Sequence, residues 1–360
     1  MIKYLGSKRR LVPVLGELFA RSGASTALDA FTGTTRVAQE FKRRGATVTT
    51  CDTATYSEIL SRCYIEADAS SVNHAELAAA VAELNTLPGK PGYFTETFCE
   101  QARFFQPRNG ARIDAMRDAI EARHRNTWLY PLLLTSLMEA ADRVDSTTGL
   151  QMAYLKQWAP RATKPMELRV PELIPGTGKA LRGDARHLVS RLSPVDLAYL
   201  DPPYNQHRYY TNYHIWETLV RWDAPQPYGI AQKRIDARSP ETKSPFNRKR
   251  EIAAALKEVI RGVKARILIL SYNNEAWLSL DELCAMLDPR GHVQVLCFDS
   301  KRYVGAQIGI HNPRGEKVGN ISHLRNLELV LVAGARDEVE HICGPFDAWS
   351  TELFSLDSRG

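Results

Sequence analysis

The sequence lacks the features that mark membrane, secreted and metal-binding proteins. Within its 360 residues, no apolar run approaches the roughly 20 residues of a membrane-spanning helix. Residues 1–8 contain no apolar signal region, so we expect a cytoplasmic protein. The six cysteines are scattered and form no CxxC pair, so neither a zinc site nor a disulfide scaffold is indicated. We therefore expect free thiols, no metal and no membrane partner.

The charge is only mildly basic, and its distribution is more informative than its sum. Lys and Arg (47) exceed Asp and Glu (41), which gives a formal net charge of +6. Basic residues gather in two polar segments, 233–250 and 299–325. Such clusters are typical of surfaces that contact phosphates, although a solvated loop explains the same charge. The residues expected to contact phosphates of a nucleic acid are Lys233, Arg234, Arg248, Lys249, Arg250, Lys301, Arg302 and Arg314.

The alternation of strands and helices predicts a doubly wound, mostly parallel α/β sheet. A short apolar strand at 26–31, a helix at 36–44 and a β-branched strand at 46–51 form its opening half. The pattern resumes after residue 177, and strands 292–298 and 326–332 are expected to be antiparallel neighbours. Between these halves the periodicity is helical. We expect a discontinuous α/β domain of residues 1–71 and 177–335, a mostly helical insertion of residues 72–176 and a C-terminal tail of residues 336–360.

An acid, two prolines and an aromatic residue follow the buried strand predicted at 195–200. In Asp201-Pro202-Pro203-Tyr204 the prolines stiffen the backbone and remove two N–H donors, so that carbonyl groups stay free. Asp201 is a hydrogen-bond acceptor on that stiff turn, and Tyr204 offers a flat face beside it. Together they can hold a planar ring that carries an amino group.

A second polar turn follows the first predicted strand, at residues 29–35 (DAFTGTT), and Asp52 ends the second strand. A turn at the carboxyl edge of a parallel sheet opens a ligand crevice, and an acid beside it can accept two ribose hydroxyls. No GxGxxG cradle is present, which favours a nucleoside without a pyrophosphate. A plain strand–turn–helix connection would look the same. Asp184, at a predicted helix start, is in the same way compatible with a simple helix cap.

In this order the motifs resemble those of the Dam-type (alpha-group) adenine-specific DNA methyltransferases. The resemblance runs from Lys3 to about Val332, with Lys3–Lys8, residues 29–35, Asp52, residues 183–186 (GDAR), the catalytic turn and residues 271–274 (SYNN) as its blocks. It implies a methyltransferase fold with a target-recognition insertion, and S-adenosyl-L-methionine as the cofactor. It also implies that an adenine is flipped out of double-stranded DNA, in an orphan enzyme or beside a cognate restriction endonuclease.

The resemblance also implies roles for single residues. Catalytic roles fall on Asp201, Pro202, Pro203 and Tyr204, and cofactor contacts on Lys3, Tyr4, Gly6, Lys8, Asp29, Phe31, Gly33, Thr34, Asp52, Asp184 and Ala185. One departure stands out, because the family usually has a second glycine where this chain has Thr35. A side chain there could crowd the methionine part of the cofactor.

Two alternatives remain open at this point. The same core could methylate an amine in RNA, or the chain could be a catalytically silent DNA-binding relative in which Thr35 blocks the cofactor. Methylation of cytosine C5 would require a catalytic cysteine, and none lies near the DPPY turn. Asparagine in place of Asp201 would have favoured glutamine in proteins as the substrate.

Overall fold

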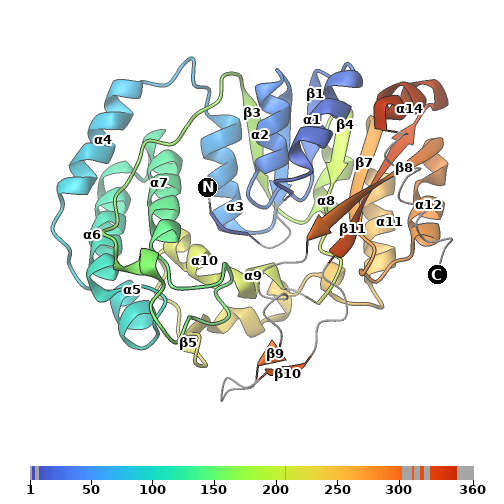
Figure 1. The fold of residues 1–360 in the computed structure, drawn as a ribbon. Coiled ribbons are helices and arrows are strands. Elements are labelled where there is room, and N and C mark those ends of the chain that lie inside the picture. The colour runs from blue at the N-terminus through green and yellow to red at the C-terminus, as the bar shows by residue number, and fades with distance from the viewer. Residues whose placement is uncertain are drawn as a thin grey trace.

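The computed structural model describes residues 2–4, 8–206, 208–301, 310–311, 317–319 and 325–346; for the strand residues 299–301, 310–311, 317–319, 325 and 326 it describes the backbone. Seven strands form one sheet in the order β3-β2-β1-β4-β7-β11-β8 (Figure 1). Its parallel strands are β1 (Thr26–Asp29), β2 (Thr47–Asp52), β3 (Gly178–Arg182), β4 (Val195–Leu200) and β7 (Ala265–Asn273). Strand β11 (Arg325–Gly334) runs antiparallel to β7 and to β8 (His292–Lys301). The predicted mostly parallel sheet with its antiparallel pair is confirmed.

Successive residues of each strand face two separate hydrophobic layers. In β4, Leu197 and Tyr199 pack into one layer, and Ala198 and Leu200 pack into the other. The first layer is covered by α1 (Val12–Arg21), α2 (Arg36–Arg43), α3 (Thr55–Ser61) and α14 (Arg336–Cys343), the second by α8 (Ala185–Leu188), α11 (Ile252–Gly262) and α12 (Leu280–Leu287). Because β1, β2, β4 and β7 are parallel, their carboxyl ends meet at one edge.

The helices of the insertion lie beside α3, at the β3 end of the sheet (Figure 1). Their leucines belong to the same hydrophobic layer as the outer face of β1 and β4. Arg117 joins them to the following segment, since its fully buried guanidinium donates to the carbonyls of Leu219 and Val220. The elements are α4 (His74–Thr86), α5 (Tyr93–Thr95), α6 (Pro107–His124) and α7 (Leu129–Arg143), with π-helical turns at Arg62–Glu66 and Glu96–Glu100 and a 3-10 turn at Pro160–Thr163.

Short elements complete the carboxyl edge and the outer loops. They are α9 (Tyr209–Asn212), α10 (His214–Arg221), the strand pairs β5 (Pro227–Tyr228) with β6 (Lys233–Arg234) and β9 (Ile310–His311) with β10 (Lys317–Gly319), and 3-10 turns at Val189–Arg191, Ile235–Arg238, Pro240–Thr242, Pro245–Asn247, Asp288–Arg290 and Gly344–Phe346. In the described part of the chain no helix is both long and apolar enough to cross a membrane.

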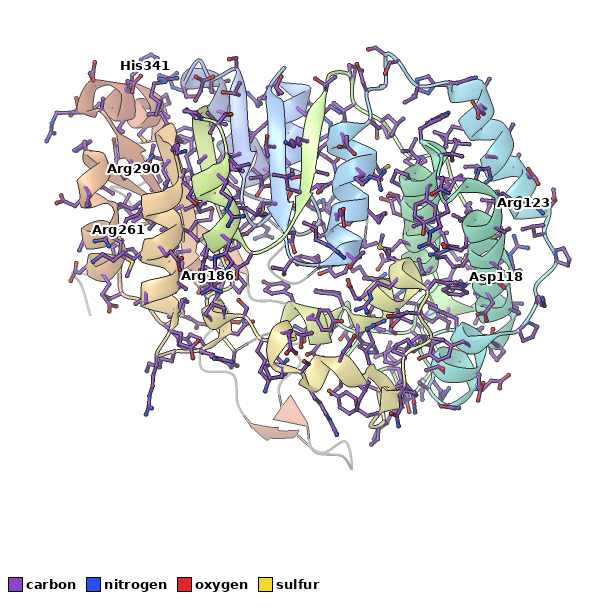
Figure 2. All side chains as sticks on the ribbon, turned by 180° about the vertical axis from the view of Figure 1, so that it is seen from behind. Asp118, Arg123, Arg186, Arg261, Arg290 and His341 are labelled. Atoms are coloured by element: carbon purple, nitrogen blue, oxygen red, sulfur yellow. The ribbon has the colours of Figure 1, made fainter. Side chains whose placement is uncertain are left out.

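Two features differ from the expectations. Strand β3 was not predicted, because Gly178–Arg182 is a half-exposed edge strand with a weak apolar pattern. The expected tail is wrong for its first eight residues, which form α14. This helix buries Val339 and Ile342 against the sheet, and Arg21 of α1 donates to the carbonyl of His341 at its end, which Figure 2 labels.

Candidate active site

A cavity of about 750 Å³ opens at the carboxyl edge of the sheet, which is within the size range of small-molecule sites. Residues from four separate parts of the chain line it. Of the predicted site residues, the lining includes Tyr4, Phe31, Asp52, Asp184, Ala185, Asp201 and Pro203. The fold thus brings the predicted cofactor and catalytic motifs to one space.

Asp52, at the end of β2, is fixed by backbone donors of two loops. Its carboxylate accepts from the N–H of Gly33 at 2.9 Å and from the N–H of Ala54 at 3.0 Å. Each carboxylate oxygen has a second lone pair, so Asp52 can still accept hydroxyl groups from the cavity. Burial raises the pKa of Asp52, while these backbone hydrogen bonds lower it.

Asp29, at the end of β1, is buried directly behind this loop. One oxygen accepts from the Thr32 hydroxyl at 3.1 Å, and the other has no hydrogen-bond partner in the part of the chain that the structure describes. Burial raises the pKa of Asp29 to about 7. An unsatisfied buried acceptor of this kind suits a cationic ligand group.

The loop after β1 contains two residues with left-handed backbone, Gly33 and Thr35. Gly33 has φ +50°, and a Cβ there would lie 3.1 Å from the ring of Tyr4, so glycine is favoured by both the backbone and the close contact. Thr35 has φ +63°, which explains why a glycine is usual at this position. Its buried hydroxyl donates to the Thr34 carbonyl at 2.7 Å and accepts from the Gln39 amide at 2.8 Å. Among the described residues that line the cavity Thr35 is absent, so its side chain does not crowd the crevice.

Lys3 and Tyr4 of the N-terminal motif lie in different surroundings. Tyr4 stacks against both Tyr209 and Tyr213, with ring centroids 5.3 Å and 4.6 Å away, and lines the cavity. Lys3 was expected to contact the cofactor, but its ammonium is engaged elsewhere. It forms ion pairs with Asp142 at 2.9 Å and Asp145 at 3.2 Å, and these tie the N-terminus to the insertion. Gly6 lies outside the described residues.

The opposite wall is built around α8 and the segment that leads into α11. Asp184 accepts from the N–H of Arg186 at 3.0 Å and thereby caps α8, while it also lines the cavity. Arg186, labelled in Figure 2, pairs with the same carboxylate. Phe31 meets Phe246 edge to face, with centroids 5.1 Å apart. Residues 239–247, predicted to be part of a DNA-binding loop, line the cavity as well.

The DPPY turn begins where β4 ends between β1 and β7. Asp201 and Pro203 line the cavity, and Pro202 is buried. The ring of Tyr204 packs at a tilt on Tyr272 of β7, with centroids 5.3 Å apart. Burial raises the pKa of Asp201 to about 6. A half-buried carboxylate and a rigid loop therefore stand together at one end of the cavity.

Lys8, predicted to contact the cofactor, lies at the catalytic turn. Its buried ammonium is 3.1 Å from Asp201 and 3.2 Å from Glu328 of β11. Glu328 was missed by the sequence reasoning. A signal did exist, because it is a lone acid inside the apolar strand pattern at 326–332.

The two basic segments divide into paired and exposed residues. The prediction that Arg234 contacts DNA is wrong, because its side chain is 1% exposed and is held by Asp223 and Asp236, each at 2.7 Å. The Lys233 ammonium lies over the Tyr228 ring. Residues 248–250 (Arg-Lys-Arg) are exposed, and of these Arg248 also pairs with the exposed Glu251 at 2.7 Å. Arg302 and Arg314 lie outside the described residues, and for Lys301 only the backbone is described. Among the described residues no group of three or more His, Cys, Asp or Glu could hold a metal ion.

The residues present fit a nucleoside with a cationic tail, as S-adenosyl-L-methionine has. The Asp52 carboxylate would accept the ribose hydroxyls and Phe31 would contact the adenine ring, since both line the cavity. Asp29 is buried behind the described lining, and its unpartnered oxygen suits the ammonium group.

Comparison with known proteins agrees with this arrangement. A family profile for the D12 class N6 adenine-specific DNA methyltransferases matches residues 4–279. Type II methyltransferase M.NlaIII of Neisseria lactamica is 28% identical over 338 residues, which cover 90% of this chain and 98% of that protein. Modification methylase StsI of Streptococcus sanguinis is 29% identical over 304 residues, which cover 79% of this chain but 46% of that protein, so the chain spans about half of StsI.

The solved structures that match are more distant in sequence and have low TM-scores. One is a magnesium protoporphyrin IX methyltransferase from Synechocystis PCC 6803 with bound SAM, with a TM-score of 0.30 and 8% identity, over 89% of this chain and 78% of that one. The family profile spans both motifs that meet in the cavity, from Tyr4 through the DPPY turn to the end of β7. The chain belongs to the D12 class N6 adenine-specific DNA methyltransferase family.

Proposed function

We propose that this DNA adenine methyltransferase draws its target base out of the duplex into the cavity beside Asp201 and methylates N6 there. The carrying observation is that Asp201 and Asp52 line one continuous cavity, so that an amine at one end can meet a cofactor at the other. An adenine inside a duplex cannot reach a carboxylate that lines a cavity, so the base has to be extruded. Within the family we assign the chain to the alpha-group, since its cofactor motif precedes its catalytic motif.

S-adenosyl-L-methionine supplies an electrophilic methyl group on a sulfonium. We assign its ribose to Asp52 and its ammonium to Asp29. Asp184 and Ala185, at the start of α8, and Phe31 would border its adenine ring. These contacts hold the donor at a fixed angle, so positioning supplies much of the rate enhancement.

The catalytic turn acts on the adenine amine. The lone pair of N6 is delocalised into the ring, which makes the amine a poor nucleophile. Asp201 and the Pro202 carbonyl accept its two hydrogens, which draws the nitrogen towards tetrahedral geometry, while Tyr204 stacks on the base. As the N–C bond forms and the S–C bond breaks, N6 becomes cationic. The Asp201 carboxylate opposes that charge and takes up the surplus proton.

The decisive experiment is expression in a methylation-free bacterial host, followed by modification-aware sequencing of the host genome. We expect one recurrent sequence to carry N6-methyladenine with the wild-type chain and none with Asp201→Ala. Methylated adenine in RNA alone would favour the RNA alternative. Unmodified DNA and RNA, from a folded wild-type protein, would overturn the proposed function.

We propose the exposed residues Arg248, Lys249 and Arg250 as a phosphate-contacting surface. They directly precede α11 and follow the turn at Pro245–Asn247 that lines the cavity, so a duplex bound there would lie at its mouth. Each lost phosphate contact lowers the slope of log K against log salt by about 0.9. Replacing all three by alanine should therefore flatten the slope by up to about 2 to 3.

Arg261 provides a matched control. It is an exposed arginine near the far end of α11, and Figure 2 labels it. Arg261→Ala should leave the salt slope unchanged, measured by fluorescence anisotropy on unmethylated duplex DNA. Equal slopes for the wild type and the triple variant would remove this surface from the DNA interface.

Sequence readout is assigned to the helical insertion, residues 72–176, which would form a target-recognition domain next to the cavity. A restriction endonuclease that cleaves the same unmethylated sequence is the proposed partner, and a cytoplasmic enzyme would meet its DNA there. The type II names of the relatives support the proposed endonuclease partner.

A further inference from the structure

A buried ammonium joins three segments that are far apart in the sequence. Lys8 Nζ lies 3.1 Å from Asp201 Oδ1 and 3.2 Å from Glu328 Oε2, and its side chain is 6% exposed. Asn273 faces Glu328 across the β7–β11 pair and donates to its other oxygen at 3.2 Å. Glu328 is thus held from two sides, by a neighbouring strand and by Lys8.

This arrangement constrains the catalytic carboxylate in two ways. Pairing of Lys8 with Oδ1 restricts rotation of the Asp201 carboxylate, so that Oδ2 is left to meet the substrate amine. An ammonium at this distance also favours the ionised carboxylate, which burial alone would disfavour. A hydrogen-bond acceptor for an N–H group must be ionised to act at full strength.

We propose that Lys8 and Glu328 form a positioning pair for Asp201: Glu328 holds Lys8, and Lys8 orients the Asp201 carboxylate and keeps it ionised for methyl transfer. The inference rests on the proposed role of Asp201 in binding the amine. It gives Lys8 a different task from the cofactor contact expected from the sequence. It also gives β11, near the C-terminal end of the sheet, a part in the transfer step. Both residues act through Asp201 and do not touch the reacting atoms.

Several other titratable groups surround Asp201. Three are phenols and one is an acid: Tyr199, Tyr204, Tyr209 and Asp29. Burial raises the pKa of each phenol, to about 12 for Tyr204, so the three stay neutral at working pH. The pKa of Asp201 is about 6 because burial raises it, Lys8 lowers it and Glu328 raises it. Lys8 and Glu328 therefore act on Asp201 with opposite signs.

The opposite signs provide the test. Single-turnover methylation of unmethylated genomic DNA, with N6-methyladenine measured by mass spectrometry, should lose rate as pH falls and Asp201 becomes protonated. The acid limb is the pH range in which the rate falls because Asp201 becomes protonated. Lys8→Met removes the favourable charge of the ammonium and should move this acid limb up by about 1 to 3 pH units. Glu328→Gln removes the unfavourable charge but keeps a side-chain oxygen that can hold Lys8, so it should move the acid limb down, by up to about 1 unit. The double variant should fall between the two.

Lys3→Met is a matched control, because Lys3 is also an N-terminal lysine paired with two acids but lies away from the cavity lining. Its acid limb should stay at the wild-type position. If Lys8→Met and Glu328→Gln lower the rate equally at every pH, or shift the limb in the same direction, the pair is structural and the inference fails. A folded wild-type chain that does not methylate adenine at any pH would instead overturn the proposed function.

Discussion

Two carboxylates end parallel strands of the same sheet and line the same cavity, yet the protein holds them differently. Asp52, after β2, accepts two backbone N–H groups from its own and the neighbouring loop. Asp201, after β4, is paired with one side-chain ammonium. The two backbone N–H groups that hold Asp52 are fixed by the fold, whereas Lys8, which pairs with Asp201, can be substituted without changing the turn.

The difference separates fixed binding from adjustable chemistry. Asp52 gains rigidity from donors that carry no formal charge, which suits an acceptor for neutral hydroxyls. Asp201 lies between a cation and a second acid, Glu328, so its ionisation depends on side chains that can be substituted one at a time. A group that has to handle a developing positive charge and a proton benefits from such control.

Matched asparagine substitutions should separate the two carboxylates most sharply. Asp201→Asn keeps the shape but loses the charge, so we expect the single-turnover rate to fall by about 100- to 1,000-fold, with cofactor affinity within a few-fold of wild type. Asp52→Asn replaces one carboxylate oxygen by an NH2 group, which cannot accept the backbone N–H that this oxygen binds. The neutral side chain is also a weaker acceptor for the ribose hydroxyls. We expect the cofactor Kd to rise about 10- to 100-fold. At saturating cofactor its rate should stay within a few-fold.

Titration with S-adenosyl-L-homocysteine measures the binding side, and methylation of unmethylated DNA at saturating S-adenosyl-L-methionine measures the rate. If both substitutions reduce the cofactor affinity, or both reduce the methylation rate, the two carboxylates do not have separate roles. A loss of cofactor affinity in Asp201→Asn alone would move Asp201 from the chemical step to cofactor binding.

The fold and the order of the motifs could be predicted because they depend on local patterns. Alternating apolar residues place β1, β2, β4, β7, β8 and β11, and each motif follows directly from the end of its strand. Edge strand β3 could not be found this way, because its half-exposed residues carry only a weak apolar pattern. The helix α14 was missed for a different reason: its acidic outer face hid the apolar stripe of Val339 and Ile342.

The parts of the site that escaped prediction are those that depend on pairing across the fold. Arg234 looked like its basic neighbours, but Asp223 and Asp236 lie against it and neutralise it inside the protein. Glu328 comes from an antiparallel strand more than a hundred residues after the DPPY turn, and only the β7–β11 register brings it to Lys8. Counting charges along a sequence does not show whether an arginine will pair with an acid of the same chain or with a phosphate of DNA.

Substitutions of Thr35 should have the smallest effect. They test whether the loop after β1 is as rigid as the backbone hydrogen bonds to Asp52 imply. Its left-handed backbone costs about 1–2 kcal/mol for an L-residue, and its two hydroxyl hydrogen bonds return about 0.5–1.5 kcal/mol each. Thr35→Gly removes both the strain and the bonds, so the free energy of unfolding should change by less than about 1 kcal/mol. Thr35→Val keeps the strain and leaves the buried Gln39 amide without its acceptor, so it should destabilise by about 1–3 kcal/mol.

Urea unfolding of the two variants measures this order. Since the Thr35 side chain points into the protein, cofactor affinity should remain within about two-fold of wild type in Thr35→Gly, where a change of 0.4 kcal/mol is about that factor. A large gain in affinity on removing the side chain would mean that Thr35 does crowd the methionine part of the cofactor. In that case the loop of β1 would have to move when the cofactor binds, and the contrast between a fixed Asp52 and an adjustable Asp201 would no longer hold.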